Sequence, residues 1–223
     1  MLAATRSRAG EMAGSPEQVV QLYIALVELE PAIWRRVQVP SDLTLHRLHG
    51  VIQAIFDWQD CHLYQFEVDG CRYAPPEEAG ETLGGDRLYS SANLRLNQLL
   101  QRGVEQFAYV YDLGDEWVHG LAIEQALTPE AGTEYPVLVD GARRAPPEDI
   151  GGPPGFEAFL EAVSDPNHPD RDEFLEWYGG NEFQPEVMDA DAIEAKLQRI
   201  RRQLRKGPQK QRSSSSRSAR QWR

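Results

Sequence analysis

The chain has 223 residues, 41% of them hydrophobic, so it is long enough to bury a sizeable core as one large domain or two small ones. Its two cysteines, Cys61 and Cys71, are too few for a disulfide scaffold and favour a reducing, cytoplasmic location. No apolar run approaches the length of a membrane span, and residues 1–18 hold two arginines without an apolar core, which excludes a secretory signal.

The net charge of −12 conceals two regions of opposite sign. Ten basic residues and no acidic ones lie from Arg199 to Arg223, so the first 198 residues hold 13 basic and 35 acidic side chains, a net charge of −22. We expect the acidic body to repel nucleic acid and the basic tail to contact phosphates weakly, in a salt-dependent way. The alternative, a solvated tail that contacts its own acidic body, is the one we favour.

Composition indicates one folded domain between two disordered ends. Residues 1–17 predict a disordered leader, residues 18–206 a single domain, and residues 207–223 a disordered basic tail rich in Ser and Arg. Strand patterns dominate the earlier part of the domain and helical patterns follow. The sequence therefore predicts an α+β fold with a mainly antiparallel sheet and C-terminal helices.

The first elements expected are two strands, Val19–Glu28 and Ile33–Val39, separated by a turn at Glu30-Pro31. Alternation in the second strand places Arg35 on the apolar face and Arg36 on the other. A buried arginine is rare without a partner. We therefore expect Arg35 and Arg36 to make structural ion pairs or ligand contacts.

A helix is predicted from Leu45 to about Asp57, with Thr44 as its N-cap and with His46 and His49 as structural side chains. A strand over 61–68 and a hairpin turn at Asp69-Gly70 follow. A polar loop is expected over 75–86 and a short helix over 94–100.

The stretch from Phe107 to Glu124 predicts a central hairpin around an LGDE turn. Residues 128–154 are rich in proline and predict no regular element. Helices are expected over 155–163 and over 170–178. A last helix is expected to start at Asp189 or Asp191, to run through Leu204 and to end at Gly207.

The central hairpin holds the first candidate site. His119 shares a strand face with Trp117, Asp115 continues that face, and Asp112 lies across the hairpin. A histidine beside two carboxylates has the composition of a metal site or an acid–base pair. The alternative, which we favour, is that the aspartates bind turn amides while Trp117 and His119 pack in the core.

Glu148 and Asp149, in the stretch APPEDIGG, form a second candidate, and an enzyme would use His62, Asp112, Asp115 and His119 together with one of them. The catalytic candidates are therefore His62, Asp112, Asp115, His119, Glu148 and Asp149, while Trp117 joins the two arginines among structural contacts. A simpler account pairs Glu148 or Asp149 with Arg35 or Arg36. Closed zinc motifs, a phosphate loop, a nucleophile elbow and a dinucleotide fingerprint are all absent from the sequence.

Four ordered blocks carry a resemblance to a known family: PAIWRRVQVP, TLHRLHGVIQAIFDWQDCHLYQFEV, YVYDLGDEWVHGLAIE and PPEDIGGPPGFEAFLEAVSDPNHPD. In this order they resemble the plasmid pRiA4b ORF-3-like family over about Gln18 to Leu197. The resemblance implies a one-domain α+β fold and little about function, since members of the family are mostly uncharacterised. Many relatives place cysteines around the PPED block, where this chain has residues such as Ala145 and Ile150, so a thiolate metal site is not available.

Some members carry transposon-resolvase or repressor labels. Serine recombination requires a nucleophilic serine in an arginine-rich site on a protein that holds DNA. A body with a net charge of −22 and no helix-turn-helix pattern does not fit that activity.

Three functions follow as hypotheses. The first is a non-enzymatic binding or interaction module with an unknown protein partner, because the ββαβ opening is similar to β-grasp folds, which often bind proteins. The second is a metal-assisted hydrolase or acid–base enzyme. The third is a mobile-element accessory protein whose basic tail touches nucleic acid weakly. No cofactor is predicted, a divalent metal is possible, and no membrane contact is expected.

Overall fold

The computed structural model describes residues 17–205 of the chain. Its strands are β1 (Val19–Leu26), β2 (Trp34–Pro40), β3 (Tyr64–Val68), β4 (Cys71–Ala74), β5 (Thr82–Leu83), β6 (Asp86–Ser90), β7 (Gln106–Tyr111), β8 (Trp117–Leu127) and β9 (Val137–Ala142). Its helices are α1 (Leu45–Ile55), α2 (Leu96–Arg102), α3 (Gly152–Ser164), α4 (Arg171–Tyr178) and α5 (Ala190–Arg205), with 3₁₀ turns at Pro76–Glu78 and Ser91–Asn93. The expected leader, apart from its last residue, and the expected tail with Gly207 lie outside the described residues.

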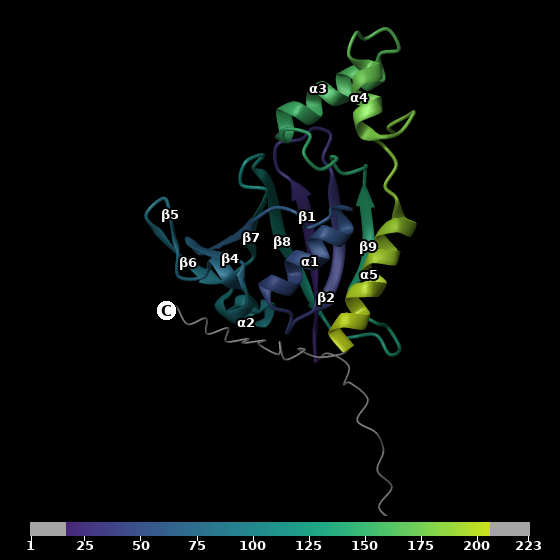
Figure 1. Ribbon diagram of the computed structural model, residues 1–223. Coiled ribbons are helices and arrows are strands. Elements are labelled where there is room, and N and C mark those ends of the chain that lie inside the picture. Colours follow the sequence, from purple (N-terminus) through teal and green to yellow (C-terminus); the bar gives the residue numbers. More distant parts are fainter. Residues whose placement is uncertain (1–16, 206–223) are drawn as a thin grey trace, which may run out of the picture.

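The strands form one nine-stranded sheet in the order β5-β6-β4-β3-β7-β8-β1-β2-β9. All neighbours are antiparallel except β4 and β6, which run parallel. Helices α1 and α5 lie side by side over one part of the sheet, and α3 and α4 form a pair beyond one end of it (Figure 1). The predicted α+β fold with a mainly antiparallel sheet is confirmed. The ββαβ opening is present in chain order, but β7 and β8 lie between β1 and β3 in the sheet.

The alternation of β1 and β2 separates a core face from an outer face. Along β1, Leu22, Ile24 and Leu26 are buried, whereas Tyr23 and Ala25 between them are half-buried. Helix α1 begins at the predicted N-cap, where the Thr44 hydroxyl accepts from the Arg47 amide. Its stripe of aliphatic side chains is fully buried, and each such side chain contributes about 1.5–3 kcal/mol of transfer free energy. No helix within residues 17–205 is long and apolar enough to cross a membrane.

Strand β9 was not predicted, because the segment from 128 to 154 has the composition of a loop. The strand pairs with β2 at the edge of the sheet, and the pairing is irregular between Arg36 and Val37. Its sequence contains Asp140 and Gly141, which have low strand propensity. Pairing with β2 overrides that propensity, which only the tertiary structure reveals.

Strand β3 begins at Tyr64, three residues later than predicted. The preceding residues leave the ladder because their backbone is held by β7: the Cys61 amide donates to the Tyr111 hydroxyl (3.1 Å), and the Asp112 amide donates to the Leu63 carbonyl (3.0 Å). Cys61 and His62 therefore sit in a loop at the end of β7 instead of alternating within the sheet. Strand β5 lies within the polar loop predicted over 75–86, and β6 begins at the last residue of that range.

Arg35 lies on the core face of β2, as the alternation predicts, and is 1% exposed. Its guanidinium donates four hydrogen bonds of 2.8 Å to backbone carbonyls, from Nε to Ile55, from Nη1 to Trp34 and Ala142, and from Nη2 to Arg143. Burial lowers the pKa of Arg35 to about 10, against the raising effect of Asp57, so the group stays charged at neutral pH. Carbonyl oxygens therefore satisfy this buried cation.

Arg36 lies on the opposite, outer face of β2. It makes a two-pronged ion pair with Glu124 of β8, with both N–O distances at 2.7 Å, and its guanidinium lies over the rings of Tyr23 and Trp34. The expected ion pair is thus present. Pairing of either Arg35 or Arg36 with Glu148 or Asp149, the simpler account given above, does not occur.

These two arginines predict a sharp difference in stability. Replacement Arg35→Met removes a buried charge that donates to four backbone carbonyls, and we expect a loss of roughly 3 kcal/mol or more in the free energy of unfolding. Replacement Arg36→Met, one residue away, removes a solvent-exposed pair and should cost much less. Urea unfolding followed by circular dichroism measures both. Equal losses in the two variants would contradict the structural role of Arg35.

Candidate functional site

Four polar side chains from three distant segments converge near the end of β7. His62 comes from the loop before β3, Asp112 from the end of β7, and Glu148 and Asp149 from the loop before α3. Nε2 of His62 lies 2.9 Å from Oδ1 of Asp149, 3.5 Å from Oδ2 of Asp112 and 3.8 Å from Oε2 of Glu148. We call these four residues the His62 cluster.

Asp112 is held by the turn that follows it. Its backbone is in the left-handed region (φ 53°), and its Oδ1 accepts from the amides of Gly114 (3.0 Å) and Asp115 (3.3 Å). An aspartate tolerates this conformation because its side chain can bind nearby backbone amides. The other oxygen, Oδ2, is thereby left to face His62.

Glu148 is fixed from the opposite side of the cluster. Its Oε1 accepts from the Gln59 amide (2.7 Å), and its carboxylate also accepts from the Tyr111 hydroxyl (3.2 and 3.3 Å). Burial, with a smaller effect of the Glu148 charge, raises the pKa of Tyr111 far above its usual range. Tyr111 therefore stays protonated and acts as a hydrogen-bond donor to Glu148.

Asp115 does not face His62. Its Oδ2 accepts from the Gly151 amide (3.1 Å) and so joins the central hairpin turn to the loop that carries Glu148 and Asp149. The two segments approach so closely that a Cβ on Gly152, whose φ is 69°, would lie 2.6 Å from the Asp115 carbonyl oxygen. Asp115 is thus a positioning residue for the cluster.

His62 is the residue on which the carboxylates converge. Its Nε2 is shielded from solvent, and its short contact with Asp149 lacks hydrogen-bond geometry, so the atom has no hydrogen-bond partner among the described residues. Within residues 17–205, Asp112, Glu148 and Asp149 have no ion-pair partner except this imidazole. Three carboxylates around one nitrogen form an uncompensated negative site, which is the environment that a cation stabilises.

The donor set fits a divalent metal. One ligand atom each from His62, Asp112 and Asp149 lie within 4.8 Å of one another, and the same holds for Cys61, His62 and Glu148. Imidazole nitrogen and carboxylate oxygen suit zinc or manganese. Burial first, and then the Glu148 charge, raise the pKa of the Cys61 thiol, so the oxygen-rich first set is the better ligand group.

The structure does not bring His119 into this cluster. It is fully buried, its Nδ1 lies 3.0 Å from the Trp117 carbonyl, and the rings of Phe56, Trp58 and Tyr109 surround it. Burial lowers the pKa of His119 to about 3, and its backbone hydrogen bonds oppose the shift only in part. It is a neutral core histidine, as the favoured alternative of the sequence analysis has it. Trp117 is likewise buried, with its ring tilted against Trp58.

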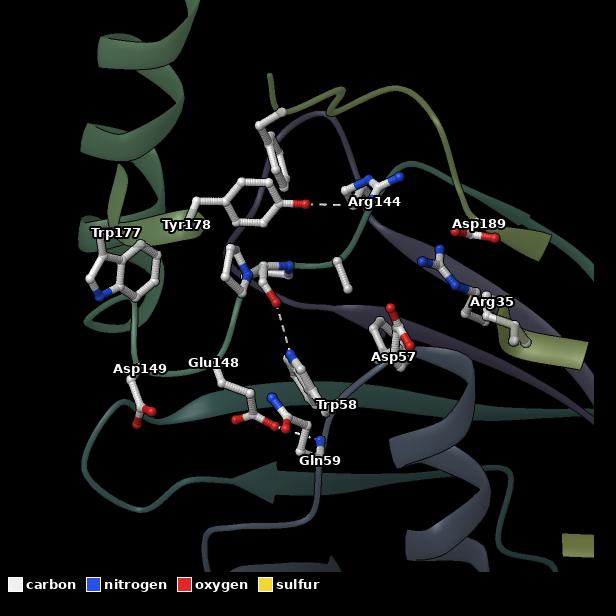
Figure 2. Close-up of a pocket in the computed structure, with 16 residues that line it drawn as sticks. Arg35, Asp57, Trp58, Gln59, Arg144, Glu148, Asp149, Trp177, Tyr178 and Asp189 are labelled. Carbon is white, nitrogen blue, oxygen red and sulfur yellow. Dashed lines mark hydrogen bonds between the residues drawn. The ribbon is translucent and has the colours of Figure 1, made fainter. Parts of the chain in front are cut away.

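A cleft of about 420 Å³ opens beside the cluster. It is lined by Trp58, Trp177 and Tyr178 together with Arg144, Glu148 and Asp149 (Figure 2). Glu148 and Asp149 also belong to the His62 cluster. The indole nitrogen of Trp58 donates to the Pro146 carbonyl (2.9 Å), and this bond holds the PPED segment, residues 146–149, against the chain that follows α1. The sequence analysis did not predict this cleft. The aromatic pair Trp177-Tyr178 and the basic pair Arg143-Arg144, just before the PPED stretch, were the sequence features that could have indicated it.

The buried state of His119 predicts a pH dependence. Because the pKa in the folded state, about 3, lies below the ordinary 6.5, the unfolded chain takes up the proton first, and stability is lost as pH falls from 6.5 toward 3. His119→Asn keeps a side-chain donor but cannot titrate. Over this window the unfolding free energy of the wild type should fall relative to the variant by up to about 1.4 kcal/mol per pH unit. Urea unfolding at a series of pH values measures the difference, and parallel pH profiles would contradict the assignment.

The chain matches the model of one protein family, described as plasmid pRiA4b ORF-3-like protein, over residues 18–192. It is 39% identical over 166 residues to the uncharacterised protein y4hQ of Sinorhizobium fredii, an alignment that covers 74% of this chain and 83% of the relative. The crystal structure of a protein of unknown function from Methanosarcina mazei, MM3350, is similar with a TM-score of 0.71 and 33% identity, over 80% of this chain and 97% of the other.

The family match covers the sheet, the His62 cluster and most of the helices, and the sequence blocks that resemble the family include every residue of the cluster. The chain belongs to the plasmid pRiA4b ORF-3-like family.

Proposed function

We propose that the protein is a non-enzymatic binding module that holds a divalent cation in the His62 cluster. The observation that carries the proposal is the convergence of three carboxylates on a solvent-shielded imidazole nitrogen that has no hydrogen-bond partner. Asp112 and Glu148 are largely buried (15% and 12% exposed) whereas Asp149 is exposed, and like charges gathered at one site disfavour one another. A bound cation removes that penalty and joins three segments of the chain.

The surroundings of the cluster support preorganised binding. Asp112, Glu148 and Asp115 each accept from backbone amides, so their positions are set before any ion arrives. Rigid ligands lose little entropy on binding. The oxygens that face His62 then serve as ligands without rearrangement of the backbone.

The chemical state of the nearby groups favours binding over catalysis. The hydroxyl of Tyr111 and the thiol of Cys61 both have raised pKa values, and His119 is sealed in the core. A nucleophile or general base works best when its pKa is moved toward neutrality. These three groups are moved away from it.

The cation proposal predicts metal uptake by untagged protein. After dialysis against a chelator, wild type should take up about one equivalent of Zn²⁺ or Mn²⁺ and become more stable to heat. His62→Ala and Asp112→Asn should each lose that uptake, because each removes a ligand of the proposed set. Isothermal titration calorimetry and elemental analysis measure binding, and differential scanning calorimetry measures stability.

His168→Ala is the matched control, since His168 lies in the turn before α4 and contacts no carboxylate among the described residues. It should bind as wild type does. Absence of uptake by the wild type, or unchanged uptake in both cluster variants, would overturn the proposal.

Metal-assisted hydrolysis is the second candidate, and one observation favours it. Glu148 and Asp149 border both the cluster and the cleft, so an ion held there would face a bound substrate. Metal-loaded wild type and metal-loaded His168→Ala would then hydrolyse p-nitrophenyl acetate or bis-p-nitrophenyl phosphate faster than chelator-treated wild type and faster than His62→Ala with added metal. Equal rates with and without the metal would leave the binding role alone.

A partner protein and nucleic-acid contact by the tail are further proposals. Within the described part of the basic segment, Arg201 pairs with Glu194 and Arg205 pairs with Glu134. Such pairs support the view that the basic segment contacts its own acidic body. We therefore favour a protein or small-molecule partner over nucleic acid.

A further inference from the structure

The cleft beside the His62 cluster has a charge balance that points to its ligand. Six charged side chains line it: Arg35, Asp57, Arg144, Glu148, Asp149 and Asp189. Its volume of about 420 Å³ falls in the range of small-molecule sites, about 300–1,000 Å³.

Outside the His62 cluster, the acidic groups that line the cleft have partners. Asp57 pairs with Lys196 (2.6 Å), and Asp189 accepts from the Ala192 amide (2.9 Å) at the start of α5. Glu148 and Asp149 belong to the His62 cluster, where their carboxylates face His62. Within residues 17–205, the remaining carboxylates of the cleft therefore do not need a cationic ligand.

Of the two arginines in the cleft, Arg35 is also engaged. Four of its five N–H groups donate to backbone carbonyls, and its guanidinium lies over the Phe56 ring at 5.1 Å. It contributes positive potential to the cleft, but it has little hydrogen-bonding capacity left.

Arg144 is different. Within residues 17–205 no carboxylate pairs with it, its Nε is buried without a partner, and its one side-chain hydrogen bond is a long contact from Nη1 to the Tyr178 hydroxyl (3.4 Å). The guanidinium lies 5.9 Å from the Phe183 ring centre (Figure 2 shows it beside Tyr178). Other described arginines, such as Arg47 and Arg87, also lack a carboxylate partner, but Arg144 is set apart because its Nε is also buried without a hydrogen-bond partner.

The other walls of the cleft are aromatic. Trp58, Trp177, Tyr178 and Phe183 line it, and Trp177 is 48% exposed. Flat rings bind flat ligands through stacking and apolar contact. The partly exposed indole of Trp177 gives such a ligand a surface to cover.

We propose that this cleft binds an aromatic carboxylate, with Arg144 as the group that holds the carboxylate and the Trp177 side of the cleft as the surface for the ring. A guanidinium and a carboxylate form two parallel charge-assisted hydrogen bonds, which give direction as well as affinity. The ligand would be a free aromatic acid or the C terminus of a chain that ends in an aromatic residue. Both sources present the same chemistry. This inference goes beyond the cation site and does not depend on it.

The experiment compares acids with their neutral amides on the full-length wild-type protein by isothermal titration calorimetry. The free-acid pair is indole-3-acetate and indole-3-acetamide. The peptide pair is Ala-Ala-Ala-Trp with a free carboxylate and with a C-terminal amide. At least one acid should bind, with Kd of about 1 mM or tighter, and its amide should bind at least about tenfold more weakly.

The variant Arg144→Met should lose at least about tenfold in affinity for the acid and should no longer distinguish acid from amide. Arg144→Lys keeps the charge but not the two-pronged geometry, so it should lie between the two. Arg87→Met is the control, because Arg87 also lies over an aromatic ring, Tyr89 at 6.0 Å, but is far from the cleft on β6. It should bind as wild type does.

Binding of the small acid alone identifies a free ligand, and binding of the peptide acid alone identifies a chain terminus; either supports the proposal. Equal affinities of wild type for acid and amide would overturn it, even if Arg144→Met failed to fold. So would the absence of saturable binding of both acids at about 10 mM. The probes contain no metal, and repeating the titration with His62→Ala separates this result from that of the cation site.

Discussion

The architecture depends on the buried guanidinium of Arg35. Its hydrogen bonds join the end of α1 at Ile55, strand β2 at Trp34 and the end of β9 at Ala142 and Arg143. β9 is an edge strand with an irregular pairing, so its backbone alone does not position the chain that follows it. The close approach leaves little room, since a Cβ on Gly141 would lie 2.9 Å from Cδ of Arg35. Arg35 thus sets the direction in which the chain leaves the sheet toward the PPED stretch.

That direction determines both sites, because one short segment borders each of them. Arg144 and Trp58, the latter through the Pro146 carbonyl, belong to the cleft, whereas Glu148 and Asp149 reach the His62 cluster a few residues later. A ligand that moves the segment in the cleft would move two carboxylates of the cluster. The two sites therefore share a physical element through which binding at one can influence binding at the other, as coupling between sites requires.

Much of this fold follows from residue patterns, and the exceptions have identifiable causes. Period-2 alternation places Arg35 in the core and Arg36 outside, but it cannot tell that carbonyls instead of carboxylates satisfy the buried charge. The same alternation puts His119 on a face with Trp117, yet the aspartates nearby belong to a turn that bends away from that face. His62 was predicted within a strand, and only its release from the ladder brings it to Asp112. The cleft depends on how α4 and α5 pack against the segment before α3, which local sequence does not encode.

The two proposed sites share one physical feature: each holds charged groups whose charge is not balanced within the described protein. Arg36 and Arg201 pair with Glu124 and Glu194 at little cost. The described chain departs from such satisfied charges at both sites: the Arg144 Nε is buried without a hydrogen-bond partner, and three carboxylates gather around one imidazole. Each departure raises the free energy of the unliganded protein and is relieved by a ligand of the opposite sign. The two sites need ligands of opposite charge, a cation and an anion, and Glu148 and Asp149 border both sites. The electrostatic effect of one bound ligand on the other site is limited by the distance between them and by salt screening. The loop that carries Glu148 is therefore where any communication between the sites must be sought.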